Sequence, residues 1–240
     1  MKTIWIITKK ELYSYFNSLI AYVMIILFLG FSGFFTWLYG ADVFLVGQAD
    51  LRTFFSVAYW TLFFFIPALT MKSIAEEKRM GTLELLLTKP ITDWQLIWGK
   101  FFGNLFIIII ALSLTFPYVI TLSNIGNIDG GAIFLGYVGL VLMSAAYIGI
   151  GIFASSISQN QIVAFLLALF IGLFFHIIFG VLASGTSGLL SNLFSYLDLN
   201  KHYDSISRGV LDTRNLFYFL SIMFIGLYLS FISLAKRNLN

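Results

Sequence analysis

Residues 101–122 read FFGNLFIIIIALSLTFPYVITL and contain no Asp, Glu, Lys or Arg. This length matches the roughly 20 apolar residues that an α-helix needs to cross a hydrocarbon core about 30 Å thick. Strands of a membrane β-barrel would alternate between apolar and polar residues over about 10 positions, whereas consecutive isoleucines occupy 107–110. A helix also satisfies its backbone hydrogen bonds internally, which lipid requires. The stretch therefore predicts a transmembrane α-helix.

Further windows share this lack of charge, at 19–39, 54–71, 132–154, 161–183 and 216–235. Only 10% of the 240 residues are charged and 60% are hydrophobic, against about 25% and about 45–50% in soluble domains. That composition disfavours a soluble enzyme, a disordered tail and a nucleic-acid-binding protein. We expect an all-α integral membrane protein whose single domain, 1–240, contains six transmembrane helices. Pro67 and Pro117 predict kinks in the second and third of these.

The positive charges indicate how the helices are oriented. The segments 1–18, 72–100, 155–160 and 236–240 would lie on one side of the membrane and together hold ten Lys and Arg residues, against four on the other side. Cytoplasmic loops carry an excess of Lys and Arg. We therefore predict a multi-pass protein with both termini in the cytoplasm.

The N-terminal segment 1–18 predicts a helix lying on the cytoplasmic membrane surface. Trp5, Leu12 and Phe16 recur at helical spacing with Tyr15 alongside, and Lys10 lies on another face. Such a helix places its apolar face in the interface and its basic residues near anionic lipid. The alternative is a simple start segment that sets the topology.

The cytoplasmic connection 72–100 predicts short helices. Ser73 and Glu76 have the spacing of a capping box, and Gly81 is suited to the left-handed position that ends a helix. A second short helix would follow over 82–87 and end at Pro90. Thr92-Asp-Trp-Gln95 is another capping box, so a helix that begins at Asp93 can continue into the third span.

These cytoplasmic helices would expose both charged and apolar side chains. The charged ones are Glu76, Glu77, Lys78, Arg79 and Glu84, and the apolar ones are Leu83, Leu85, Leu86 and Leu87. Apolar side chains beside charges on a small helical knob suit docking into a groove of another protein. The alternative is a solvated loop whose leucines pack against the bundle.

The longest outer connection, 184–215, predicts two short helices. The first carries an apolar stripe of Leu189, Leu190, Leu193, Phe194 and Leu197, and is too short to cross the membrane. The second would begin at Asp204 or Ser205, with Tyr203, Ile206 and Val210 on one face. Helices of this kind could cover the mouth of a pathway, or they could be a surface cover without a gating role.

His176 is the one ionisable residue, tyrosine aside, inside a predicted span. Intramembrane ionisable residues are candidates for function, so His176 is a candidate for a transport pathway; the alternative is a packed, hydrogen-bonded histidine. The chain has no cysteine and no Gly-x4-Gly-Lys-Ser/Thr phosphate loop. We therefore expect neither a metal site nor a bound cofactor, and no ATP hydrolysis by this chain.

A longer motif in the cytoplasmic connection resembles a known family. The run 76–90, EEKRMGTLELLLTKP, followed by Gly99-Lys100, resembles the signature of ABC-2-type transporter permeases. The order of surface helix, six spans and long outer segment also resembles that family. The outer stretch 202–218 is similar to a narrower group within it, the permeases of gliding-motility transporters.

The resemblance implies a division of labour between chains. Separate ATPase subunits would bind ATP and Mg²⁺ and dock on the connection 72–100. The coupling residues would be Glu76, Glu77, Lys78, Arg79, Gly81, Thr82, Leu83 and Glu84. The outer gate would comprise Leu189, Leu193, Phe194, Leu197, Ile206 and Val210.

On this interpretation the chain is the permease subunit of an ATP-driven exporter or motility-linked complex in the bacterial inner membrane. A second permease chain, identical or related, would complete the pathway, with lipid around it and no nucleic acid as partner. The alternative is a membrane scaffold that recruits an ATPase or motility machinery without translocation. The sequence does not indicate the substrate or the direction of transport.

Overall fold

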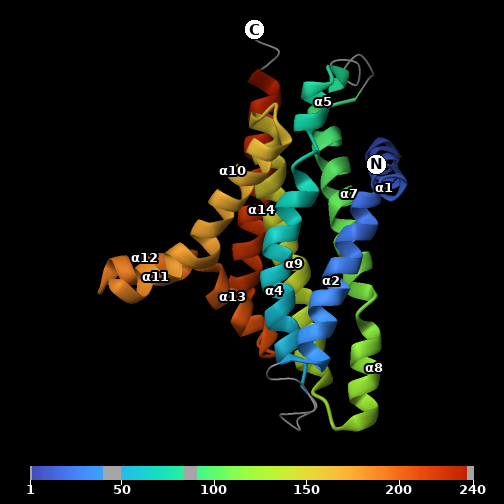
Figure 1. The fold of residues 1–240 in the computed structure, drawn as a ribbon. Helices are drawn as coiled ribbons and strands as arrows, with labels where there is room; N and C mark the ends of the chain where they lie inside the picture. Colours follow the sequence, from blue (N-terminus) through green and yellow to red (C-terminus); the bar gives the residue numbers. More distant parts are fainter. Residues whose placement is uncertain (1, 40–49, 84–90, 237–240) are drawn as a thin grey trace.

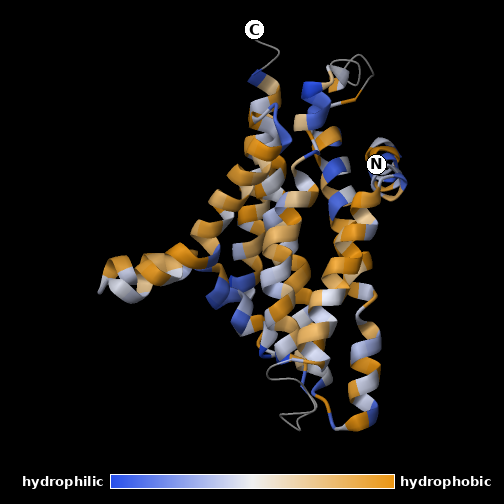
Figure 2. Cartoon of the chain, viewed as in Figure 1, coloured by the Kyte–Doolittle hydropathy of each residue, from blue (hydrophilic) through white to orange (hydrophobic). Residues whose placement is uncertain are grey.

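The computed structural model describes residues 2–39, 50–83 and 91–236, and within these ranges every regular element is helical (Figure 1). In this part of the chain, six stretches are long and apolar enough to cross a membrane. The predicted all-α fold with six candidate transmembrane helices is therefore confirmed. Figure 2 shows apolar residues along most of their length.

Five of the six stretches contain their charge-free windows and extend beyond them at one end or both, whereas the first ends at Trp37, two residues short of its window. The six stretches are α2 (Leu19–Trp37), α4 (Arg52–Thr70) with α5 (Ala75–Arg79), α7 (Asp93–Ser113) with α8 (Phe116–Ile125), α9 (Gly130–Ile157), α10 (Gln161–Leu173) with the π-helix η1 (Phe174–Ile178) and α11 (Phe179–Gly185), and α14 (Thr213–Ala235). Helices continue past their apolar windows because backbone hydrogen bonding does not stop where charge begins.

Residues close in sequence determine where the third span begins and where its helix breaks. The predicted capping box is present, since the Thr92 hydroxyl accepts from the Gln95 N–H and the Gln95 side chain accepts from the Thr92 N–H. The span then breaks between α7 and α8, with Pro117 in the first turn of α8. At the break, the hydroxyls of Thr115 and Tyr137 are hydrogen-bonded at 2.7 Å. Pro67, by contrast, lies inside α4.

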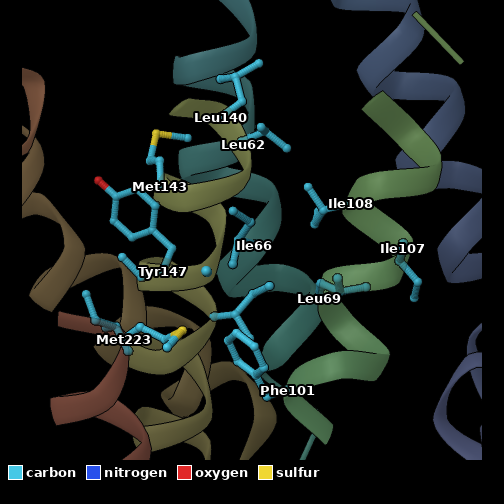
Figure 3. Close-up of a cluster of buried hydrophobic side chains, with 14 of the residues drawn as sticks. Leu62, Ile66, Leu69, Phe101, Ile107, Ile108, Leu140, Met143, Tyr147 and Met223 are labelled. Carbon is cyan, nitrogen blue, oxygen red and sulfur yellow. The ribbon is translucent and has the colours of Figure 1, made fainter. Parts of the chain in front are cut away.

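Helix α9 is the centre of the bundle. It packs against α14, α4, α10, α7 and α13 (Leu199–Ser207). Figure 3 shows Leu140, Met143 and Tyr147 of α9 in the buried apolar cluster. From the other helices this view adds Leu62, Ile66 and Leu69 of α4, Phe101, Ile107 and Ile108 of α7, and Met223 of α14.

Helices α9 and α14 cross with their backbones in contact. A Cβ atom added at Gly226 would lie 2.5 Å from the carbonyl carbon of Gly149, and one added at Gly149 would lie 2.8 Å from the carbonyl oxygen of Met223. Small residues allow such close approach, which favours helix association in lipid. This crossing therefore depends on glycine at both positions.

Helix α1 (Lys2–Asn17) forms as predicted, but a different face is buried in the protein. The buried side chains are Ile7, Thr8, Glu11 and Tyr15, whereas Trp5 is half exposed. The reason lies in α7, where Gly99 and Gly103 leave room for α1. A Cβ on Gly99 would lie 2.5 Å from Ile7, and one on Gly103 would lie 2.7 Å from Glu11. The glycine groove, rather than the apolar stripe, therefore selects the face that packs.

The two short helices of the outer connection are also present, with one boundary corrected. Helix α12 (Leu189–Leu197) agrees with the predicted first helix. The second, α13, begins at Leu199 rather than at 204 or 205, because the Asp198 side chain caps it by accepting from the Asn200 N–H. Val210 lies beyond its end. Figure 1 shows α11 and α12 extending sideways from the bundle.

The crossing of α9 and α14 gives a first prediction. Gly226→Ala should lower the free energy of unfolding by about 1–3 kcal/mol, because the new Cβ overlaps backbone atoms that cannot rotate away. Thermal denaturation of the purified chain in detergent measures this.

Gly30→Ala in α2 is the matched control, because no atom lies within 4 Å of the added Cβ. It should leave the midpoint unchanged or raise it slightly, since alanine favours a helix over glycine. Equal midpoints for both variants would contradict the close crossing.

Candidate functional site

The connection between the second and third spans begins with a short helix whose cap comes from another helix. The predicted capping box of Ser73 and Glu76 is wrong, because Ile74 occupies the N-cap position of α5 and makes no side-chain cap bond. The Ser155 hydroxyl of α9 accepts from the N–H groups of Ile74 and Ala75, both at 2.9 Å. It also donates to the Met71 carbonyl at 3.0 Å. Helix α5 is therefore fixed to the central helix.

The end of α5 agrees with the sequence prediction. Gly81 follows it with φ +67°, a left-handed conformation that glycine adopts without strain. Thr82 then donates to the Glu77 carbonyl at 3.4 Å. Residues 84–90, which include Glu84, three of the predicted leucines and Pro90, lie outside the described residues.

A buried ammonium group joins three helices next to α5. Lys100 of α7 is 1% exposed, and its Nζ lies 3.0 Å from Oε1 of Glu11 in α1 and 2.9 Å from Oε1 of Glu77 in α5. Lys10 approaches the same oxygen of Glu77 at 3.8 Å. The positive charges of two lysines thus balance the negative charges of two glutamates. Because removal of one partner from a buried ion pair leaves an uncompensated charge, the cluster ties α1, α5 and α7 together.

A second set of hydrogen bonds continues from this charge cluster toward α4. The Tyr15 hydroxyl lies 2.7 Å from Asn104 Oδ1 and 3.0 Å from the Leu69 carbonyl. Asn104 Nδ2 donates to Ser73 Oγ at 3.2 Å and to the Lys100 carbonyl at 2.8 Å. Burial, followed by the charge of Glu11, raises the pKa of the Tyr15 phenol. The phenol therefore stays protonated and can donate.

The predicted coupling residues divide into buried and accessible ones. Leu83 was expected to be exposed, yet it is only 2% exposed and belongs to the apolar core. Glu77 faces Lys100, and Lys78 Nζ donates to the Ser156 carbonyl. Arg79 is exposed, as is the neighbouring Met80, which was not among the predicted residues and is 56% exposed.

A cavity of about 430 Å³ opens between these elements, with Lys10, Glu76, Glu77, Met80 and Thr82 in its walls. In the described ranges no three His, Cys, Asp or Glu side chains gather as metal ligands would. The walls of this cavity therefore bring charged, polar and apolar side chains together.

The predicted gate residues do not meet in one cluster. Ile206 is fully buried in the core, whereas Leu189, Leu193 and Val210 are exposed. Phe194 stacks on Phe179 of α11 with ring centroids 6.2 Å apart. The Leu197 carbonyl accepts from the Tyr218 hydroxyl of α14 at 2.6 Å. A gating role stays a prediction.

His176 is buried in the π-helix η1, which agrees with a packed and hydrogen-bonded histidine. Its Nδ1 lies 2.8 Å from the Tyr147 hydroxyl. Its ring lies between the rings of Tyr59 and Phe63, with centroids 4.3 and 4.2 Å away. Nε2 has no hydrogen-bond partner among the described residues. A part in a transport pathway stays a prediction.

The sequence interpretation missed the residues that hold α5 in place: Glu11, Tyr15, Lys100, Asn104 and Ser155. A signal was available, because Glu11 and Tyr15 are one turn apart in α1, and Lys100 and Asn104 are one turn apart in α7. Two polar pairs beside the Gly99 and Gly103 groove indicate a polar contact between these helices.

The fold and this site define a multi-pass α-helical membrane protein with a polar joint at one end of the bundle. Residues 5–237 match the family described as ABC-2 family transporter protein. The chain therefore belongs to the ABC-2 family of transporter proteins.

Relatives in two strains of Escherichia coli, K12 and O157:H7, are both named "Probable multidrug ABC transporter permease YbhR". Each is 26% identical over 151 residues, a match that covers 60% of this chain and 39% of the relative. The match thus spans well under half the length of these relatives.

The charge cluster yields a second prediction. Lys100→Met should lower the free energy of unfolding by about 3–5 kcal/mol, because two buried carboxylates lose their shared cation. Thermal denaturation of the purified chain measures this. The triple variant Lys100→Met, Glu11→Gln, Glu77→Gln should recover most of the loss, since no buried charge is then unpaired.

Arg208→Met provides a control, because it breaks the exposed pair with Asp204 and exposed pairs contribute little. A Lys100→Met midpoint as high as that of Arg208→Met would argue against the charge cluster as a stabilising joint.

The cap supplied by Ser155 gives a third prediction. Ser155→Ala should destabilise the start of α5 by about 0.5–2 kcal/mol, the usual effect of losing a helix cap. Hydrogen exchange should then be faster at the amides of Ile74 and Ala75. Ser156→Ala is the control, because among the described residues that hydroxyl donates to the Phe153 carbonyl of its own helix and not to α5. Unchanged exchange in Ser155→Ala would show that the cap is dispensable.

Proposed function

We propose that this chain is the membrane-spanning permease subunit of an ATP-driven ABC-2-type transporter, in which separate ATPase subunits bind ATP and Mg²⁺. The family supports the permease part of this proposal. The observation that carries the coupling part is the fixed position of α5. Its first turn is capped by α9, and its Glu77 shares Lys100 of α7 with Glu11 of α1.

This geometry suits the transmission of movement. A partner that displaces α5 must move α7 and α9 with it or break buried polar bonds. Breaking a buried ion pair costs several kcal/mol. Concerted movement of the helices therefore has the lower free energy, which is what a transporter driven by a separate ATPase requires.

The accessible side of α5 is the proposed docking surface for the ATPase. Arg79 and Met80 are exposed, and Glu76 and Lys78 are partly exposed. An apolar side chain surrounded by charges provides both an anchor and electrostatic complementarity for a partner. Glu76, Lys78, Arg79, Gly81 and Thr82 therefore keep their proposed coupling role, and Glu77 and Leu83 would act by holding this surface in place.

The finer proposals concern assembly and location. We place the chain in the bacterial inner membrane with both termini cytoplasmic, as part of an exporter or a motility-linked complex. A second permease chain, identical or related, would complete the pathway. The proposal of a second chain is supported by an apolar face that α11 and α12 leave uncovered. Leu189 of α12 is 80% exposed, and Figure 2 shows apolar residues along the projecting α11 and α12.

The docking proposal gives a fourth prediction. Full-length chain purified from its native membrane in mild detergent should carry an ATPase with a phosphate loop. The double variant Arg79→Glu, Met80→Asp should lower its recovery about tenfold or more, because a docking anchor and a charge are both lost. The amount of ATPase per permease, measured by quantitative mass spectrometry, tests this.

Ile125→Asp at the end of α8 is the control, because it also places an acid at an exposed apolar position but at the other end of the bundle. It should leave ATPase recovery unchanged. The proposal is wrong if no ATPase accompanies the wild-type chain, or if the double variant retains it in full.

A further inference from the structure

A large cavity lies where α4 and α9 begin. Figure 1 shows that these helices begin at the end of the bundle opposite α5. The volume of the cavity is about 1020 Å³, and its walls come from the starts of α4 and α9 and from α13. These walls include Tyr59 and Trp60 of α4, Asp129 before α9, and Tyr203 of α13. None of these belongs to the coupling site.

One wall of the cavity holds a hydroxyl without a partner. Tyr59 is 4% exposed, and its hydroxyl has no hydrogen-bond partner in the described part of the chain. Its ring is fixed between those of Tyr203 and His176, with centroids 4.8 and 4.3 Å away. Buried polar groups are normally hydrogen-bonded, and an unpaired one is costly. Tyr59 is one of the residues that line the cavity, so a ligand that reaches its hydroxyl would satisfy it.

The charges in the walls favour a cation. Arg52 is paired with Asp50 at 2.8 Å, and Arg208 is paired with Asp204. Asp129 has no ion-pair partner in the described ranges; one of its oxygens accepts from the N–H groups of Gly131 and Ala132. Among the described residues, three aspartates and two arginines line the cavity. These residues carry a summed formal charge of −1, and the unbalanced charge is that of Asp129.

The aromatic residues add a second attraction for a cation. Trp60 lines the cavity and is 45% exposed, so its ring is open to a ligand. The indole face attracts ammonium groups more strongly than the other aromatic side chains do. Phe55, also in the wall, provides apolar surface for the body of a ligand. The Tyr59 oxygen can accept a hydrogen bond from an ammonium N–H.

We propose that this cavity binds an organic ammonium ion, a protonated amine attached to an apolar body. Asp129 supplies the charge, Trp60 the aromatic face and Tyr59 the hydrogen-bond acceptor. The inference deepens the proposed permease function by naming a ligand class for the end of the bundle away from α5. Binding needs no ATPase, so it can be tested separately from coupling.

Isothermal titration calorimetry on the full-length chain in lipid nanodiscs, without nucleotide, tests the proposal. The probes are benzylammonium, benzyl alcohol and benzyltrimethylammonium, with empty nanodiscs subtracted. Benzylammonium should bind about tenfold or more tightly than benzyl alcohol, since charge-assisted contacts are the stronger ones. Equal binding of the amine and the alcohol, or no binding of the amine, would overturn the proposal.

Variants assign the three roles. Asp129→Asn should weaken benzylammonium about tenfold while keeping the cap of α9, because asparagine caps a helix as well as aspartate does. Asp212→Asn is the matched control, since Asp212 caps α14 in the same way and does not line the cavity. Equal effects of the two substitutions would contradict a specific role for Asp129.

Tyr59→Phe should weaken benzylammonium but not benzyltrimethylammonium, which has no N–H to donate. This variant should fold normally, because the hydroxyl that it removes has no partner in the described structure. Trp60→Leu should weaken both cations, whereas Trp94→Leu at the start of α7 should weaken neither. Unchanged affinity of benzylammonium in Tyr59→Phe or in Trp60→Leu would overturn the assignment of that residue.

Discussion

The ammonium group of Lys100 is the constraint on which the end of the bundle that holds α5 depends. A cation that is 1% exposed must find anions, and the two that it finds are 89 residues before it, on α1, and 23 residues before it, on α5. These ion pairs therefore join both helices to α7, and α1 packs along it. The glycines on α7 permit this approach, because Gly99 and Gly103 remove the side chains that would hold α1 away.

Close packing at small residues also explains why α9 is the central helix. Its small residues let α14 approach closely, and one of them, Ser155, also supplies the cap of α5. Close approach and polar satisfaction are linked, since a hydroxyl on a short side chain can reach a neighbouring backbone only when the helices lie close together. A larger residue at this position would fill the space that the start of α5 occupies.

The sequence predicted the features that depend on neighbouring residues. Charge-free windows predict spans because burial in lipid acts on each window separately. Gly81 and the box of Thr92 and Gln95 act within one turn, and both are confirmed. Ser73 also has the spacing of a cap, yet Ser155, about 80 residues away, caps the helix instead. The start of α13 was missed although Asp198 is a local signal.

Contacts between distant segments could not be predicted from spacing. The apolar stripe of α1 predicts the face that meets the membrane surface, but the groove that selects the face packed against the protein belongs to α7. Nothing near Lys100 in sequence identifies Glu11 and Glu77 as its partners. The cavity beside Tyr59 likewise combines residues from α4, α9 and α13, which the chain brings together only when folded.

The turn between α4 and α5 connects the two ends of the bundle. Between Thr70 and Ala75 the helix gives way to turns, a place where a long helix could bend. The Ser155 hydroxyl makes hydrogen bonds at both ends of this turn. It donates to the Met71 carbonyl and accepts from the N–H groups of Ile74 and Ala75. A bend there would have to break these bonds. With the bonds intact, α4, α5 and α9 move as one body, and that body carries both Glu77 at one end and Tyr59 toward the other.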